Sequence, residues 1–201
     1  MTDNSRDKQK WNSRYSSISD ASEKDIDMLQ PSKVLLENAY LLPASGSALD
    51  LACGLGANAL FLDRQSLETY AWDISDVAIE HLRKVIISSS LNIKLETRDV
   101  VARPPQKNSF DVIVVSHFLD RTLTTPLIEA LTPGGLLFYQ TFTVEKIPGI
   151  GPSNPDYLLQ PNELLELFKG LRIRVYREEG MEGDLTQGFR NEAMLVAQKV
   201  T

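Results

Sequence analysis

The sequence predicts a doubly wound α/β fold, with a seven-stranded, mostly parallel sheet, helices on both faces and an antiparallel last strand. Two observations carry this prediction. Short apolar runs alternate with helical patterns along most of the 201-residue chain, which is typical of parallel strands covered by helices. Near the end of the chain, two further apolar runs follow each other with no helical pattern between them, so these two should pair antiparallel.

The chain is expected to begin with a flexible tail that is followed by one domain. Residues 1–10 are polar, and we expect them to be solvated. The remaining residues, 11–201, have the length of a single domain. Pro31 suits the first turn of a helix that runs to about Tyr40.

The predicted parallel strands are apolar runs bounded by polar or glycine-containing loops. Uninterrupted runs of this kind suit strands that are buried on both faces of a sheet. They are Ala48–Leu51, Thr69–Trp72, Phe110–Val115 and Leu136–Gln140, with Ile93–Thr97 as a less apolar fifth. Between them, Ile79, Leu82 and Ile86 fall at helical spacing. Ser75 stands where it can cap that helix at its N-terminus.

The last two predicted strands differ in their patterns. Residues 171–178 alternate between apolar and polar side chains, whereas Ala193–Ala197 is a continuous apolar run. A segment with Gly180, Gly183 and Gly188 separates them. These two strands complete the seven and supply the antiparallel end of the sheet.

Composition argues against several classes of function. The formal net charge of −6 argues against a broad nucleic-acid surface, which needs clustered Lys and Arg. The one cysteine, Cys53, excludes an internal disulfide and a cysteine metal cluster. The two histidines, His81 and His117, lack a metal-ligand spacing, so no metal is expected.

The chain also lacks sequence signals for a membrane. No run approaches the roughly 18 apolar residues of a membrane span, and the first ten residues lack the apolar stretch of a signal peptide. We therefore expect a cytoplasmic protein without a membrane partner. The sequence makes no prediction about the oligomeric state.

The clearest functional motif is ALDLACGLGANALFL, residues 48–62. A predicted strand ends at Asp50, a turn carries Gly54 and Gly56, and a helix begins near Asn58. The glycines allow the backbone to turn tightly and to approach a ligand closely. The start of the helix offers free N–H donors, and nucleotides bind at this position in open α/β sheets.

Two kinds of protein fit part of this motif. The spacing from Gly54 through Gly56 to Ala59 also matches the dinucleotide fingerprint of NAD-dependent oxidoreductases. Asp50 argues against that alternative, because a carboxylate beside the turn would oppose a pyrophosphate but would suit an ammonium group. A cofactor-binding protein without turnover is the second alternative, since it would carry the same motifs.

The motif resembles the first motif of class I S-adenosylmethionine-dependent methyltransferases. Four later segments resemble that family's further motifs in matching order: residues 69–75, 98–100, 110–116 and 131–136. The similarity covers about residues 11–201. A closer likeness is to the small tellurite-resistance and thiol methyltransferase-like branch, which the segments at 11–15, 53–58 and 71–73 resemble. Ala57 stands where that branch often has an arginine.

The resemblance implies a methyltransferase that uses S-adenosylmethionine, releases S-adenosylhomocysteine and acts on a small-molecule acceptor. Asp73 would accept hydrogen bonds from the ribose hydroxyls, and Asp99 would accept one from the adenine amino group. Arg14 and Tyr15 would close over the methionine carboxylate. The candidate cofactor-binding residues are Arg14, Tyr15, Asp50, Ala52, Gly54, Gly56, Asn58, Asp73, Ile74, Asp99, Val100 and Ser116.

The acceptor is expected beyond the carboxyl ends of the fourth and fifth strands. His117 follows the fourth strand and is the candidate catalytic residue, because histidine can take up a proton near neutral pH. A Pro- and Gly-rich loop over residues 142–160 follows the fifth strand at the same edge, where long loops often act as lids. Phe118, Pro152 and Tyr157 are the candidate substrate-loop residues.

Overall fold

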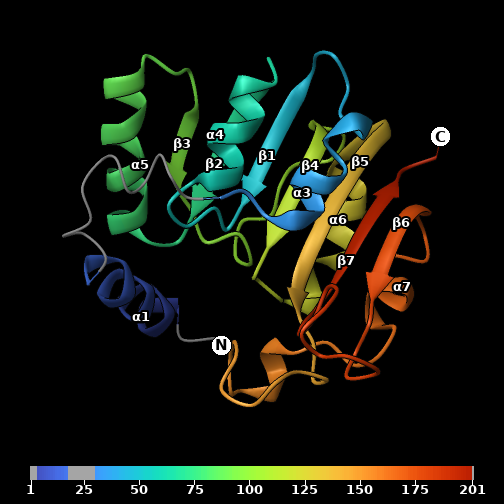
Figure 1. The fold of residues 1–201 in the computed structure, drawn as a ribbon. Coiled ribbons are helices and arrows are strands. Elements are labelled where there is room, and N and C mark those ends of the chain that lie inside the picture. Colours follow the sequence, from blue (N-terminus) through green and yellow to red (C-terminus); the bar gives the residue numbers. More distant parts are fainter. Residues whose placement is uncertain (1–3, 18–29, 201) are drawn as a thin grey trace.

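Seven strands form one sheet in the part of the chain that the computed structural model describes, residues 4–17 and 30–200 (Figure 1). Their order across the sheet is β3-β2-β1-β4-β5-β7-β6. β7 runs antiparallel to both of its neighbours, and the other neighbouring pairs are parallel. The strands are Ser47–Leu51 (β1), Glu68–Asp73 (β2), Lys94–Thr97 (β3), Phe110–Ser116 (β4), Leu131–Phe142 (β5), Arg172–Glu178 (β6) and Glu192–Gln198 (β7). The predicted fold class is confirmed.

The uninterrupted apolar runs become central strands because both of their faces are covered. In β4, Ile113 and Val115 pack into the core on one face, and Val112 and Val114 pack into the core on the other. All four side chains are fully buried. Each contributes roughly 1.5–3 kcal/mol relative to exposure, so a polar residue at any of these positions would weaken the sheet.

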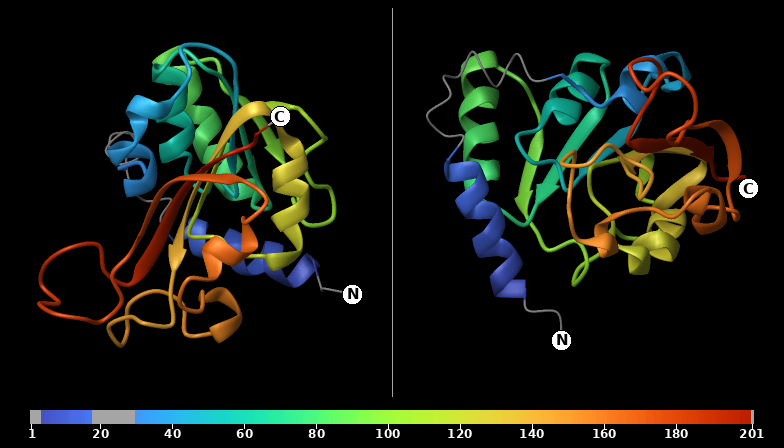
Figure 2. Two further views of the ribbon diagram at one scale, coloured as in Figure 1. Left: turned by 90° about the vertical axis from the view of Figure 1, so that its right-hand side faces the viewer. Right: turned by 60° about the horizontal axis from the view of Figure 1, so that its bottom comes forward.

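Helices cover both faces of the sheet, as the left view of Figure 2 shows. One face carries α3 (Lys33–Glu37), α4 (Ala57–Arg64) and α5 (Asp76–Ser89), and the other carries α6 (Thr124–Ala130) and α7 (Glu163–Leu167). Ser75 caps α5 as predicted, because its Oγ accepts a hydrogen bond from the Ala78 N–H at 3.2 Å. Three short 3-10 turns are Ala39–Leu41 (η1), Arg121–Leu123 (η2) and Pro155–Tyr157 (η3).

The N-terminal region differs from the expected irregular tail. Residues 4–10 belong to a helix, α1 (Asn4–Ser16). Its polar sequence gave no amphipathic signal, but contacts with the rest of the fold hold it: the Lys8 ammonium lies 2.6 Å from the Asp76 carboxylate, and the Asn12 side chain bonds to Ser75. Propensity alone does not predict such a helix, since its partners lie some 60 residues along the chain.

Two other boundaries also differ from the prediction. The helix expected from Pro31 to Tyr40 begins only at Lys33 and ends at Glu37, and η1 follows it. The cause lies at Ser32, whose N–H and Oγ both donate to the Asn58 side chain and so hold the chain short of a helix there. The fifth strand is expected over residues 136–140, but β5 starts five residues earlier, at Leu131, and its register with β4 shifts between Leu131 and Leu136.

The carboxyl ends of the parallel strands meet at one edge of the sheet, as they do in doubly wound folds. In Figure 1 this edge points downward, and α1 and the segment after β5 lie along it; the right view of Figure 2 brings it forward. Within the described ranges, no helix has the length and apolarity to cross a membrane. Nor do the side chains of these residues form a group of three His, Cys, Asp or Glu suited to a metal ion.

Candidate active site

The turn between β1 and α4 has the backbone conformation that its glycines suggest. Gly54 (φ +53°) and Gly56 (φ +85°) are both in the left-handed region. A Cβ on Gly56 would overlap the side chain of Leu82 in α5. Glycine therefore lets the start of α4 approach α5 closely while the chain reverses direction. Ala52 also has a positive φ, of +57°, so strain is concentrated in this turn.

Asp50 lies beneath this turn and is fully buried. Its Oδ2 accepts a hydrogen bond from the Ala59 N–H at 3.0 Å, and its Oδ1 accepts one from the Asn58 amide at 3.4 Å. Burial raises the pKa of Asp50 to about 7, although these two hydrogen bonds oppose the rise. In this structure the carboxylate holds the first turn of α4. Its contact with a cofactor ammonium group stays a prediction.

Asp73, at the end of β2, connects the turn to the next strand. Its Oδ2 accepts from the Gly54 N–H and its Oδ1 accepts from the Ser75 N–H, both at 2.8 Å. Burial raises the pKa of this carboxyl, and the backbone hydrogen bonds oppose the rise. A carboxylate has about four acceptor positions, and backbone hydrogen bonds from Ser75, Gly54 and Ile74 use three of them. The ribose contact of Asp73 stays a prediction.

Helix α1 covers this side of the turn. A Cβ placed on Gly54 would lie 2.7 Å from the Tyr15 hydroxyl oxygen, so the phenol rests against the glycine backbone. The Ser75 hydroxyl donates to the Asn12 side chain at 2.6 Å and fixes the helix next to Asp73. Burial, followed by the charge of Asp73, raises the pKa of Tyr15. The Arg14 guanidinium lies 5.4 Å from the Trp11 ring and is exposed, so the structure directs it along α1.

The predicted adenine contacts lie beyond β2. Ile74 is half-buried next to Asp73. Asp99 uses its Oδ1 to accept from the N–H groups of Val101 and Ala102, at 2.9 and 3.1 Å. The Val100 side chain packs into the core beneath them. Asp99 thus organises the turn after β3, and its contact with adenine stays a prediction.

A cavity of about 360 Å³ opens on the other side of the glycine turn. Ser116 contributes to it, and its Oγ accepts from the Asn58 amide at 2.9 Å, which joins the end of β4 to the start of α4. Four of the predicted residues come together here: Gly56, Asn58, Ser116 and His117. The described residues that complete the lining are Gln30, Pro31, Ser32, Lys33, Cys53, Leu55, Ala57, Gln140, Phe189, Arg190 and Glu192.

His117 stands on the wall of this cavity in a strained backbone conformation, with φ +53°. Its N–H donates to the Gln140 carbonyl at 2.8 Å, and its Nε2 lies 3.1 Å from Oε1 of Glu192. Glu192 was not singled out in the sequence, because it stands at the start of an apolar strand some 75 residues away. Only the pairing of β7 with β5 brings it to this edge.

The predicted substrate-loop residues lie elsewhere. Phe118 packs against the core, and neither it nor Pro152 nor Tyr157 is part of the described cavity lining. The Tyr157 ring instead lies 5.1 Å from the Lys10 ammonium of α1. The loop and α1 therefore meet over the carboxyl edge, a contact that the sequence does not indicate.

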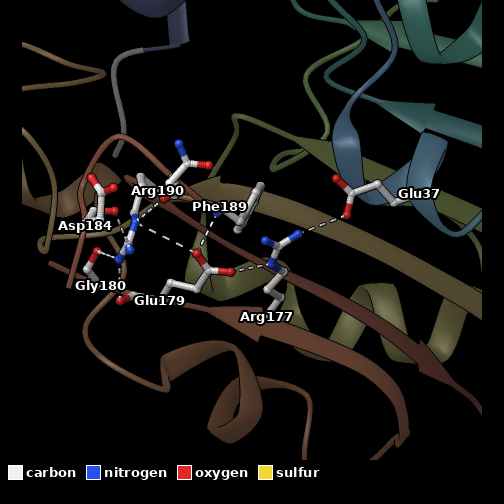
Figure 3. A network of polar contacts seen from close by, with 8 residues as sticks. Glu37, Arg177, Glu179, Gly180, Asp184, Phe189 and Arg190 are labelled. Atoms are coloured by element: carbon white, nitrogen blue, oxygen red, sulfur yellow. Dashed lines mark hydrogen bonds and ion pairs between the residues drawn. The ribbon is translucent and has the colours of Figure 1, made fainter. Parts of the chain in front are cut away.

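Phe189 and Arg190, from the segment between β6 and β7, line one side of the cavity. Figure 3 shows the polar contacts of this segment. The Arg190 guanidinium donates to four backbone carbonyls of that segment, at 2.7 to 3.2 Å. The Glu179 carboxylate accepts from the Phe189 N–H at 2.7 Å and pairs with Arg177. The Arg177 guanidinium reaches Glu37 of α3 at 3.4 Å. These contacts hold Phe189 and Arg190 at the cavity without a ligand.

Comparisons with known proteins give matches over the part of the chain that contains the glycine turn. A family model described as a methyltransferase domain matches residues 48–135, which contain the glycine turn, Asp73 and β4. The "probable S-adenosyl-L-methionine-dependent methyltransferase TehB" of Haemophilus influenzae is 30% identical over 138 residues, which are 65% of this chain. Over these residues the chain is similar to S-adenosylmethionine-dependent methyltransferases.

Further relatives and solved structures extend the comparison. The chain spans about half the length of the TehB sequence, 47%. A "ubiquinone biosynthesis O-methyltransferase" of Xanthomonas axonopodis is 25% identical over 88% of this chain and 81% of its own. The crystal structure of TehB superimposes with a TM-score of 0.68 at 23% identity, covering 84% of this chain and 62% of TehB. A structure described as "conversion of a disulfide bond into a thioacetal group during echinomycin biosynthesis" gives 0.70 at 22% identity, covering 96% and 92%.

Proposed function

We propose that the chain is a class I S-adenosylmethionine-dependent methyltransferase that transfers the methyl group of S-adenosylmethionine to a small-molecule acceptor. The observation that carries the proposal is the glycine turn, with Asp73 bonded to Gly54 on one side and the 360 Å³ cavity open on the other. A cavity in the range of roughly 300–1,000 Å³ suits a small ligand. The small molecule named in the description of the Xanthomonas relative supports the same class of acceptor.

The residues at the turn fit an S-adenosylmethionine cofactor. Asp73 would accept hydrogen bonds from the ribose hydroxyls, and Tyr15, whose hydroxyl lies against Gly54, would close over the cofactor. Gly56 and Asn58 would face the amino-acid part of the cofactor from the cavity side. When bound, the cofactor supplies a methyl group that its sulfonium already activates. The chain's own contribution is then to orient the acceptor, to exclude water and to take up a proton where one must leave.

Asp50 argues against the NAD-dependent alternative. In dinucleotide-binding folds the pyrophosphate sits on the N–H groups at the start of the first helix. Here the carboxylate of Asp50 already accepts the Ala59 N–H of that turn. Because the Asp50 carboxylate lies beneath the start of the helix, it would repel a doubly charged pyrophosphate at close range.

The partner and location predictions belong to the same proposal. The net charge of −6 supports a small-molecule partner over a nucleic acid. The cytoplasmic location, the absence of a membrane partner and the single domain over residues 11–201 stay predictions of the sequence.

A methyl-release assay tests turnover. The full chain would be incubated with S-adenosylmethionine and a panel of hydroxyl, thiol and amine acceptors, and S-adenosylhomocysteine would be quantified. We expect product with at least one class of acceptor, and at least about tenfold less product from His117→Ala if that acceptor arrives protonated. Binding of the cofactor without product from any acceptor would instead support the cofactor-binding protein without turnover.

A further inference from the structure

Glu192 and His117 form a pair at the cavity that links two distant parts of the chain. Oε1 of Glu192, at the start of β7, lies 3.1 Å from Nε2 of His117, which follows β4. The Glu192 side chain is 16% exposed and the His117 side chain is 45% exposed. The carboxylate is thus the inner member of the pair, and the imidazole is the member that a ligand in the cavity can reach.

Gln140 holds both members of the pair. This buried residue of β5 accepts the His117 N–H at its backbone carbonyl, 2.8 Å away. Its side-chain amide donates to Oε2 of Glu192, and its Oε1 accepts from the Val34 N–H of α3 at 2.7 Å. The Val34 N–H thus fixes the Gln140 side chain, and the Gln140 amide in turn directs the Glu192 carboxylate. A buried polar network with all its members satisfied is rigid.

The pair specifies one form of the neutral imidazole. An ionised carboxylate only accepts hydrogen bonds, so the proton shared with Glu192 belongs to Nε2 of His117. Nδ1 then retains its lone pair. His117 also has a left-handed backbone conformation. Strain of this kind persists only where surrounding contacts hold a residue in place, and it often occurs at functional sites.

Other charged and titratable groups line the same cavity as the pair. Lys33 of α3 and Cys53 of the glycine turn line the same cavity. The Arg190 guanidinium, just before β7, is occupied by four backbone carbonyls. β5 contributes the uncharged Phe142 ring, whose centroid lies 5.0 Å from that of His117. Glu192 is therefore the charged group that directs the imidazole.

We propose that Glu192 is a positioning residue that holds His117 with its proton on Nε2, so that Nδ1 removes the proton of a hydroxyl-bearing methyl acceptor. This inference rests on the proposed function and names its acceptor class. A thiol with an ordinary pKa of about 8.5 supplies its own thiolate, whereas a hydroxyl group needs a base. The proton passes from the hydroxyl to Nδ1, the oxygen lone pair forms the bond to the methyl carbon, and the sulfur keeps the electron pair of the broken bond. The resulting imidazolium faces the Glu192 carboxylate, which stabilises it.

The tautomer of His117 tests the pair without any substrate. Two-bond ¹H–¹⁵N correlation spectra of the ¹⁵N-labelled full chain distinguish the protonated ring nitrogen from the bare one. The chain has two histidines, so His117→Gln assigns the signals and His81 is an internal reference. We expect His117 to carry its proton on Nε2, and Glu192→Gln to abolish this preference. Glu129→Gln removes a carboxylate of α6 that pairs with Lys107, and it should leave the pattern unchanged.

Activity tests the consequence for the acceptor. We expect Glu192→Gln to lower kcat by at least about tenfold with hydroxyl acceptors and by less than about twofold with a thiol assayed as its thiolate. Affinity for S-adenosylhomocysteine should not change. A proton on Nδ1 in the parent chain, or a tautomer that Glu192→Gln does not alter, would overturn the inference whether or not the chain is an active enzyme. Equal losses with both acceptors would also overturn it. Failure to bind S-adenosylhomocysteine with the expected tautomer intact would contradict the proposed function alone.

Discussion

The carboxylate of Asp73 accepts the Gly54 N–H at 2.8 Å and so fixes the end of β2 against the turn that follows β1. The same side chain accepts the Ser75 N–H with its other oxygen. One buried carboxylate therefore sets the shape of the turn and the start of α5. Its hydrogen bond with the ribose of the cofactor stays a prediction.

Substitution of Asp73 should weaken cofactor binding. Hydrogen bonds to charged groups contribute about 1.5–3 kcal/mol each, so Asp73→Asn, which removes the charge at constant shape, should lower the affinity for S-adenosylhomocysteine at least about tenfold. Asp63→Asn, at a half-buried position of α4 outside the described cavity lining, is the matched control. Calorimetric titration of both variants measures the difference. Equal affinities would reduce Asp73 to a residue that shapes the turn.

Gly56 should tolerate a methyl group less well than Gly134. Both have φ +85°, so alanine is strained to a similar degree at either position. At Gly56 the added Cβ also overlaps Leu82, whereas at Gly134 no heavy atom of the described chain lies within 4 Å of it. We expect Gly134→Ala to cost about 1 kcal/mol of unfolding free energy and Gly56→Ala about 1–3 kcal/mol more. Denaturant unfolding measures both; equal costs would contradict the close approach of α4 and α5.

Asp50 should make the folded state less stable as the pH rises. Burial raises its pKa in the folded state to about 7, whereas the unfolded chain has an ordinary value of about 3.9. Between these two values the folded state binds more protons than the unfolded state, so stability falls with increasing pH, by at most about 1.4 kcal/mol per pH unit. Asp50→Asn removes this slope. The unfolding free energy of the variant minus that of the parent chain should therefore increase from pH 5 to pH 7.

Asp111 gives a control of opposite sign for that experiment. Burial alone would raise its pKa, but hydrogen bonds from Ser47 and Thr132 lower it overall. Its contribution to stability is present above the ordinary carboxyl pKa and is lost as the pH falls through the lowered value. Asp111→Asn should therefore reduce stability at neutral pH and lose this effect in acid. Parallel slopes for the two variants would contradict the burial of Asp50.

The loop after β5 should influence the acceptor more than the cofactor. Tyr157 is 38% exposed and meets Lys10 of α1 over the carboxyl edge, outside the glycine turn. We expect Pro152→Ala combined with Tyr157→Ala to change turnover or acceptor preference while affinity for S-adenosylhomocysteine stays within about threefold, because an exposed cation–π contact contributes only about 0.5–1 kcal/mol. Parallel losses of affinity and turnover would show that the loop helps to build the cofactor site.

The sheet could be predicted from the sequence because its central strands are buried on both faces. Runs such as Val112–Val115 have few alternatives to a covered strand, and the glycine turn is readable because its spacing reflects backbone conformation. Helix α1 could not be predicted in this way, since its stability comes from Ser75 and Asp76 far along the chain.

The site was predictable only in part, for a related reason. Local motifs indicate Asp73 and His117, which directly follow or end apolar strands. Gln140 and Glu192 stand equally close to strand ends, but their roles depend on the pairing of β5 with β7. The burial of Asp50 likewise depends on how α4 folds back over β1. Relationships across the sheet, rather than along the chain, decide these roles.

Titration calorimetry of the full chain with S-adenosylhomocysteine and with NADH, under the same conditions, tests the central claim most directly. We predict one site for S-adenosylhomocysteine and no heat of binding for NADH. Thermal unfolding should follow the same order, because a ligand at about 100 times its dissociation constant adds roughly 2.7 kcal/mol to the stability of the folded state. Saturable binding of NADH, with none of S-adenosylhomocysteine, would contradict the account.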